Sequence, residues 1–539
     1  MKALVLAAAL AASPSAALAC GGLFCDNSQP VVQAAERILF ARDGDRVVMH
    51  VRLTWAGPPT DFGWLLPVPA DVETSLSSEQ LFTALDQAYG PVFQLSTEFI
   101  DCDDQFFGGA GGAGGGGGQG GGFADAGAAG PDVNILSREQ VGPYDRTILQ
   151  GETVQDLIEW LTTNGYQVPA GAEETLDPYV QMGAAFVAIK LVPGAGSAEV
   201  VPLALTFTAP SPAIPLRPTA NAANPDMGII VHVLGDARAV PVNFRHVVIN
   251  EGAINWQSGG SNYADVVSQA ADEAGGRAFA TDFAGRQQLA PPAPIPLDRL
   301  GDDPSWSTVI ENLPFFDADM QRVLATVITS TQPDVTVQEL LQCPFCWDAE
   351  VATVDGPALI QKIREEINAP REALAGLFEA HPYMTRLYTT MSSAEMDADP
   401  IFDTNPDLED VPNVRTATQY VTCDDTGFRF DEATIETASG LRFTLQDGQN
   451  PDVIQRQDGE TVRGMDVPAA AIIEQALVAG QSRIVEDRRP TLARRYGAAM
   501  PQGSDSGCDG CDVSTGGGPS AALLVIAGLA LGRRRRRVG

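Results

Sequence analysis

The chain has 539 residues, 44% of them hydrophobic, and its 69 acidic and 34 basic residues give a formal charge of −35. That length suggests two to four domains, and the hydrophobic content is that of a globular rather than a disordered protein. A field of this sign repels the phosphates of nucleic acids and of anionic lipids, so we expect no nucleic-acid partner.

The first nineteen residues have the layout of a secretory signal peptide. Lys2 precedes an apolar run from Ala3 to Ala12, and Ala17-Leu18-Ala19 forms a small-residue cleavage site. We therefore predict cleavage between Ala19 and Cys20 and an exported, extracytoplasmic body. The alternative is lipidation of Cys20, which fits less well because that signal requires a bulkier aliphatic residue where Ala17 stands.

Runs of β-branched residues with alternating polarity predict strands after the signal. These predicted strands cover residues 37–41, 46–55, 62–67, 146–150, 184–192, 200–208, 228–234 and 244–250. Two helices are predicted between them, at 77–89 with a serine cap and at 153–163, where Asn164-Gly165 ends the helix because both residues tolerate positive φ. This part therefore reads as a sheet with covering helices.

A glycine-rich stretch interrupts this pattern at residues 108–122 and continues to residue 131. It has no side chains that pack, and we predict a disordered insert. It also matches glycine-rich phosphate-binding motifs, but no strand leads into it and no Gly-Lys-Ser/Thr follows, so we assign it no ligand.

From Ala270 to about Ser393 the pattern is predominantly helical, with expected helices at 320–329, 337–341, 358–367 and 371–380. Strands are predicted again at 416–423, 429–430 and 441–445. The sum is an α+β, multi-domain protein with mostly antiparallel strands and a segregated helical region. The predicted regions are a signal peptide (1–19), an α+β body (20–290) with the insert at 108–131, a helical region (291–400), a β-rich C-terminal region (401–500), a linker (501–518), and an apolar segment with an arginine cluster (519–539).

Several distinctive sequence blocks follow one another along the chain. They are CGGLFC at 20–25, QAAERILF at 33–40, DFGWLLPVP at 61–69, EWLTTNGY at 159–166, FVAIKL at 186–191, PLALTFTAPSPAIPL at 202–216 and YMTRLYTTMSSAEM at 383–396. Together these blocks resemble the DUF2330 family of uncharacterised exported bacterial proteins. The resemblance covers about residues 20–417, and it implies no activity and no functional residues.

The chain contains eight cysteines, and export favours disulfides between them. Three close pairs are Cys20 with Cys25, Cys343 with Cys346, and Cys508 with Cys511, which leaves Cys102 and Cys423. A disulfide between Cys102 and Cys423 is the simplest way to pair all eight cysteines, although spacing alone does not determine which cysteines are joined. In the loop-entropy model a four-residue ring contributes about 2 kcal/mol, whereas a loop of about 320 residues contributes up to about 5–6 kcal/mol.

CPFC at Cys343 to Cys346 admits three interpretations. A redox motif of the thioredoxin kind lies at the start of a helix after a strand, whereas this one follows a predicted helix outside any βαβ unit. A zinc site requires a second such pair or nearby histidine. We expect a structural disulfide, with redox activity and metal binding as the alternatives.

Oxygen-bearing side chains alternate in DTNPDLED, at Asp403, Asn405, Asp407 and Glu409. This makes them a weak calcium candidate, but Leu408 and Val414 stand where an EF-hand has glycine and glutamate. We therefore interpret this segment as an acidic turn, and we expect no cofactor other than this weak calcium candidate.

We name no catalytic residue. The four histidines, His50, His232, His246 and His381, are scattered, and the chain has neither HExxH nor a Gly-x-Ser-x-Gly elbow.

The apolar segment at residues 519–532 is followed by five arginines. As a helix it spans about 21 Å, short of a hydrocarbon core of about 30 Å. The layout resembles bacterial C-terminal sorting signals of the MYXO-CTERM kind, which implies a sorting protease as partner, transient membrane contact, and Cys508 or Cys511 as the processing or lipid-attachment site. Gly516 to Gly518 also resembles the GlyGly-CTERM form. An ordinary single-pass anchor is the alternative.

We therefore expect a non-enzymatic, exported cell-envelope or surface protein with a binding or structural role and an unknown envelope ligand. The alternative function is an exported enzyme of the hydrolase or thiol-disulfide type.

Overall fold

A computed structural model describes residues 32–56, 62–100, 133–192, 200–221, 223–424, 427–457, 460–463 and 466–496. The described part of the chain forms one compact unit, within Met1–Ala498. The predicted signal peptide, glycine-rich insert, linker and apolar C-terminal segment lie outside the described residues.

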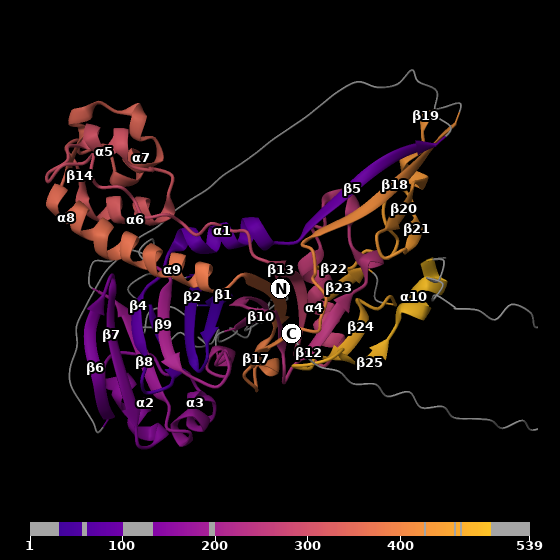
Figure 1. The fold of residues 1–539 in the computed structure, drawn as a ribbon, viewed down its shortest axis with the longest axis horizontal. Helices are drawn as coiled ribbons and strands as arrows, with labels where there is room; N and C mark the ends of the chain where they lie inside the picture. The colour runs from indigo at the N-terminus through magenta and orange to yellow at the C-terminus, as the bar shows by residue number, and fades with distance from the viewer. Residues whose placement is uncertain are drawn as a thin grey trace, which may run out of the picture. The chain divides into compact units, whose positions relative to one another are not determined.

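The largest element of the fold is a mixed ten-stranded sheet (Figure 1). Its strands in spatial order are β25 (Arg483–Asp487), β24 (Ala470–Gln475), β12 (Arg245–Ile249), β13 (Ala278–Arg286), β16 (Tyr383–Met391), β10 (Ala223–Gly235), β1 (Val32–Asp43), β2 (Arg46–Ala56), β9 (Leu203–Thr208) and β4 (Glu73–Leu76). Only the β1–β10 and β12–β13 pairs are parallel. The sheet therefore unites strands from the beginning, middle and end of the described chain.

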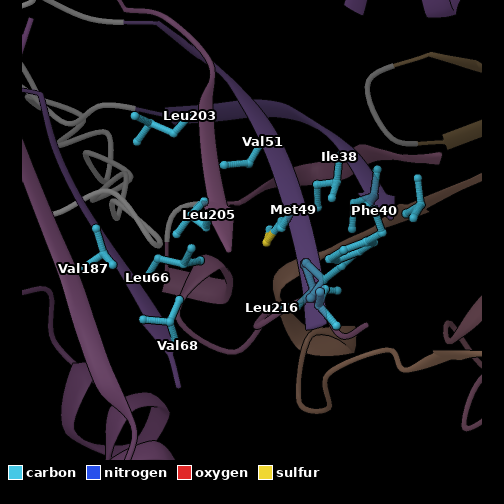
Figure 2. Close-up of a cluster of buried hydrophobic side chains, with 14 of the residues drawn as sticks. Ile38, Phe40, Met49, Val51, Leu66, Val68, Val187, Leu203, Leu205 and Leu216 are labelled. Carbon is cyan, nitrogen blue, oxygen red and sulfur yellow. The ribbon is translucent and has the colours of Figure 1, made fainter. Parts of the chain in front are cut away.

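A four-stranded antiparallel sheet packs against one face of the main sheet. It contains β3 (Gly63–Val68), β8 (Ala185–Leu191), β7 (Tyr144–Gly151) and β6 (Val133–Val141). Figure 2 shows the buried side chains between the two sheets, with Met49 and Leu205 facing Leu66 and Val187. The outer face of the smaller sheet is covered by α2 (Val154–Thr163) and α3 (Ala172–Gln181) through a second apolar cluster.

Helices cover the other face of the main sheet. The helices α1 (Glu79–Tyr89) and α9 (Ala369–Ala380) bury Leu39 and Leu234, and α4 (Tyr263–Glu273) covers β12 and β13. Ser78 caps α1 by accepting a hydrogen bond from the amide of Leu81, as expected of a serine at this position.

The short helices between the strands β13 and β16 have a core of their own. They are α5 (Trp306–Asn312), α6 (Ala318–Val327), α7 (Val337–Gln342) and α8 (Gly356–Lys362), which continues as a π-helical turn to Asn368. A small ladder, β14 (Ile328–Ser330) with β15 (Ala352–Val354), lies among them. These elements correspond to the predicted segregated helices.

A further small sheet forms around β18 (Val414–Asp424), which pairs in parallel with β5 (Val92–Ile100) over nine residue pairs. Its other strands are β19 (Gly427–Phe428), β20 (Thr434–Thr437) and β21 (Arg442–Thr444). Smaller elements are the pairs β11 (Arg238–Pro241) with β17 (Phe402–Asn405) and β22 (Gln455–Gln457) with β23 (Glu460–Arg463), and the helix α10 (Arg489–Tyr496).

The architecture confirms the predicted α+β class with mostly antiparallel strands. The helical pattern predicted from Ala270 to Ser393 is wrong at β13 and β16, which are central strands of the main sheet. The predicted strand at 429–430 is also wrong, because the strand there is Gly427–Phe428 and a 3-10 turn, Phe430–Glu432, follows it. None of the helices in the described ranges is long and apolar enough to cross a membrane.

Candidate functional site: an arginine-lined pocket on the main sheet

A pocket of about 420 Å³ opens beside β12, β13 and β24. This volume lies within the usual range of small-molecule sites, about 300–1,000 Å³. Its polar lining is Arg238, His246, Thr281, Glu409, Arg415, Glu474, Gln481, Ser482 and Arg489, and its apolar lining is Val247, Val248, Ile249, Ala280, Leu408, Val411, Ile472 and Ile484. Polar and aliphatic side chains therefore share one concave surface.

A chain of hydrogen bonds runs along one side of the pocket. The Oε1 atom of Glu474 is 2.9 Å from Nδ1 of His246, and Nε2 of His246 is 2.8 Å from Oγ1 of Thr281. The guanidinium of Arg238 donates from Nη2 to the same Thr281 oxygen at 3.2 Å. An ionised carboxylate only accepts hydrogen bonds, so Nδ1 of His246 carries the proton that Glu474 accepts, and the unprotonated Nε2 of a neutral imidazole accepts from the Thr281 hydroxyl.

Strand pairing brings the side chains of Glu474, His246 and Thr281 together. His246 lies directly opposite Glu474 in the antiparallel β12–β24 pair, and β13 lies on the other side of β12. A bulge in β13 separates Thr281 from Phe283. The bulged residue, Asp282, is fully buried and bonds to Tyr263 and Arg386, whereas Thr281 lines the pocket. Bulges commonly re-aim side chains in this way beside functional sites.

Burial and hydrogen bonding set the charge states of His246 and Glu474. Burial lowers the pKa of His246, and its hydrogen bond to Glu474 offsets this only in part, so the imidazole is neutral at pH 7. Burial raises the pKa of Glu474, but the hydrogen bond from His246 and the charges around it outweigh that effect, so its net pKa is lowered. A neutral imidazole is thus held by an ionised carboxylate.

Two arginines approach Thr281 from different elements. Arg238, at the start of β11, donates to the Thr281 hydroxyl, and Arg415, near the start of β18, donates from Nη2 to the Thr281 carbonyl at 3.2 Å. Burial lowers the pKa of Arg238, and the charges of Glu474, Tyr383 and Asp410 oppose this shift. Both guanidiniums retain a buried Nε atom that has no hydrogen-bond partner within the described part of the chain.

The predicted CPFC site lies elsewhere. Cys343 and Cys346 are joined by a disulfide with a Cα–Cα distance of 5.4 Å. Cys343 caps the C-terminus of α7, and Pro344–Cys346 forms a 3-10 turn. This position differs from the helix N-terminus that activates a redox thiol.

The remaining cysteine predictions fall mainly outside the described residues. Cys423 is disulfide-bonded, and β5 ends with Ile100 paired to Thr422, beside that cysteine. The Cys102–Cys423 pairing remains a prediction, because Cys102 lies outside the described residues. The same is true of Ala19, Cys20, Cys25, Cys508 and Cys511.

The four calcium candidates contact different partners. Asp403 pairs with Arg42 at 3.2 Å, and the amide of Asn405 donates to the carbonyls of Leu477 and Gly480. Asp407 accepts from the Gly480 amide at 2.7 Å, and the exposed Glu409 lines the pocket. Among the described residues, no group of three or more His, Cys, Asp or Glu side chains is arranged to hold a metal ion.

Sequence reasoning missed the pocket. His246 and Glu474 are 228 residues apart and Arg238 and Arg415 lie in separate elements, so no local motif connects them. A signal available in the sequence was the single histidine in the predicted strand at 244–250, which also suits a structural histidine.

The fold and the pocket define an α+β protein with an open, arginine-lined site on a large mixed sheet. The chain belongs to the DUF2330 family, described as an uncharacterized protein conserved in bacteria, whose model matches residues 14–332, more than half of the chain. That range contains Arg238, His246 and Thr281, whereas Arg415 and Glu474 lie beyond it. Searches of curated proteins and of solved structures gave no match.

Proposed function

We propose that this protein is a non-enzymatic, exported cell-envelope protein, displayed on the outer surface, that binds a small ligand in the pocket beside Thr281. The observation that carries the binding function is the pocket itself, in which two arginines without a salt-bridge partner in the described part of the chain and a set of aliphatic side chains line one concave surface. Export rests on the signal-peptide layout of residues 1–19, and surface display rests on the sorting-signal layout of the C-terminal segment.

A pocket-filling variant with a neighbouring control tests the binding function. Ile484 and Val485 are adjacent on the edge strand β25 and are each 50% exposed, but only Ile484 lines the pocket. We expect wild type and Val485→Trp to retain a small molecule from an envelope extract, detected by mass spectrometry after denaturation, and Ile484→Trp to lose it. Equal retention by both variants, or no retained molecule in the wild type, contradicts ligand binding at this pocket.

The hydrolase alternative is supported by one observation, the alignment of Thr281, His246 and Glu474. A hydroxyl, a neutral imidazole and a carboxylate in this order constitute a nucleophile, a base and an orienting group. Thr281→Val and Thr281→Ser distinguish the two functions when turnover of a chromogenic ester is measured. Binding alone predicts no turnover above that of buffer in any variant, whereas a hydrolase loses activity in Thr281→Val and retains it in Thr281→Ser.

The thiol-disulfide alternative predicts an exchangeable bond between Cys343 and Cys346. Labelling of free thiols in the native protein tests it, and we expect neither cysteine to react, because the bond lies at the end of a helix rather than at its start.

A further inference from the structure

Two of the three arginines that line the pocket, Arg238 and Arg415, make no direct contact with a carboxylate in the described part of the chain. Arg238 donates to the Thr281 hydroxyl and to the backbone carbonyl of Glu409, and Arg415 donates to the Thr281 carbonyl. All three acceptors are uncharged oxygens. In the described ranges neither guanidinium forms a salt bridge, unlike Arg489 of the same pocket, which pairs with Asp487 at 2.7 Å.

The nearby carboxylates form no salt bridge with Arg238 or Arg415, although the charges of Glu474 and Asp410 act on Arg238. Glu474 accepts from His246, and Asp410 accepts from the hydroxyl of Tyr383 at 2.6 Å. Arg238 contacts Glu409 through its main-chain carbonyl rather than its carboxylate. Two guanidiniums bonded to one residue, neither of them in a salt bridge, are therefore placed to bind the carboxylate of a ligand, because the planar guanidinium fork matches the geometry of that group.

The rest of the pocket is aliphatic. Val248 and Ile484 are 39% and 50% exposed, and Ile472 completes this wall. Apolar surface that faces an open pocket gains free energy when a ligand removes it from water. A small inorganic anion does not cover this wall, whereas a molecule with a hydrocarbon portion does.

We propose that the pocket binds an organic carboxylate with a short aliphatic chain, with Arg238 and Arg415 holding the carboxylate and Val248, Ile472 and Ile484 covering the chain. This inference rests on the proposed binding function and specifies the class of ligand.

Isothermal titration of the purified full-length protein with octanoate, 1-octanol and inorganic phosphate tests this proposal without any variant. We expect octanoate to bind at least about tenfold more tightly than either comparator, because only octanoate offers both the charge and the chain. Octanol binding as tightly as octanoate overturns the role of charge. Phosphate binding as tightly overturns the role of the aliphatic wall, and absence of octanoate binding overturns the proposal.

Variants assign the carboxylate to its arginines. Arg238→Gln and Arg415→Gln are each expected to weaken octanoate binding about tenfold. Arg489→Gln, which removes an exposed and already paired arginine of the same pocket, is expected to change it less than about twofold. Unchanged affinity in both Arg238→Gln and Arg415→Gln overturns the assignment. Circular dichroism checks that each variant is folded. Arg415→Lys retains the charge and should therefore bind octanoate more tightly than Arg415→Gln does.

The Ile484→Trp variant separates this inference from the proposed function. If Ile484→Trp abolishes binding of octanol and octanoate alike while wild type binds both equally, the pocket binds ligands but not through charge. If Ile484→Trp binds both the envelope-derived molecules and octanoate as tightly as the wild type does, the proposed binding function itself is wrong.

Discussion

Arg371 and Asp319 form a buried ion pair that joins α9 to α6, with 2.6 Å between Nη2 and Oδ2 and both side chains 3% exposed. Asp319 also accepts hydrogen bonds from the hydroxyl of Ser78 at 2.6 Å and from the amide of Glu79 at 2.8 Å. One carboxylate therefore links the helical region to the N-terminus of α1, and α1 in turn covers the main sheet.

Asp319→Ala is expected to destabilise the protein by about 3 kcal/mol, because it leaves a buried arginine with one carboxylate fewer and two buried donors without an acceptor. Urea denaturation followed by circular dichroism measures the change. Asp145→Ala is the control, since its pair with Arg138 is exposed and is expected to contribute less than about 1 kcal/mol. Equal losses in the two variants contradict the linking role of Asp319.

His50 predicts a loss of stability in mild acid. This residue is buried on β2, its Nδ1 atom lies 2.7 Å from the hydroxyl of Ser77, and burial lowers its pKa to about 4. Between about pH 6.5 and pH 4 the unfolded chain binds a proton that the folded protein does not, so stability is full above about pH 6.5 and falls as the pH decreases. The contribution lost by pH 5 is about 2 kcal/mol.

The variant His50→Gln isolates this effect. We expect the free energy of unfolding to fall less between pH 7.5 and pH 5 in His50→Gln than in the wild type, because the other histidines are common to both proteins and cancel in the comparison. An identical pH dependence in the two proteins argues against a lowered pKa for His50.

The disulfides are predicted to differ in their contribution to stability. The four-residue ring closed by Cys343 and Cys346 contributes about 2 kcal/mol, whereas the loop of about 320 residues predicted for Cys102–Cys423 contributes up to about 5–6 kcal/mol. Cys423→Ser should therefore lower the melting temperature more than Cys346→Ser does. Peptide mapping under non-reducing conditions identifies the partner of Cys423, and a partner other than Cys102 refutes the predicted pairing.

Processing at both ends is a prediction about intact mass. If the signal peptide and the sorting signal are removed, the mature protein begins at Cys20 and lacks Arg533 to Arg537. Mass spectrometry of the protein purified from its own envelope measures this directly. Retention of the five arginines refutes the sorting signal and supports the single-pass anchor.

Calcium binding at Asp403, Asn405, Asp407 and Glu409 predicts a melting temperature that falls when a chelator is added. The amide of Asn405 and the carboxylate of Asp407 are already engaged in hydrogen bonds to the segment near Gly480. We therefore expect an unchanged midpoint, and a decrease on adding EDTA that calcium reverses would restore the calcium hypothesis.

Sequence patterns predicted the elements whose local signals agree with their packing. The strand β2 alternates apolar and polar residues from Met49 to Trp55, and α2 is capped by Thr153 in a capping box closed by Asp156. The strand β13 was missed because five of the nine residues of AFATDFAGR are alanine, aspartate or glycine, which have little intrinsic strand preference. Its conformation is set by pairing with β12 and β16, which depends on residues far away in the chain.

The candidate site was beyond prediction for the same physical reason. Arg238, His246 and Thr281 come from three strands, and Glu474 reaches His246 only because β24 pairs with β12. The CPFC disulfide, by contrast, needed only the spacing of two neighbouring cysteines, and the structure contains it.

The interleaved strand order has a consequence for biosynthesis. β16 separates β10 from β13, and β5 pairs with β18 across more than 300 residues. Because synthesis starts at the N-terminus, β10 and β5 have unpaired edges until residues 383–424 have been made. Exposed strand edges can pair with other chains. Such long-range pairing also folds slowly. The nascent protein thus has a long window of aggregation risk, and we expect it to depend on a holding chaperone until its last third is synthesised.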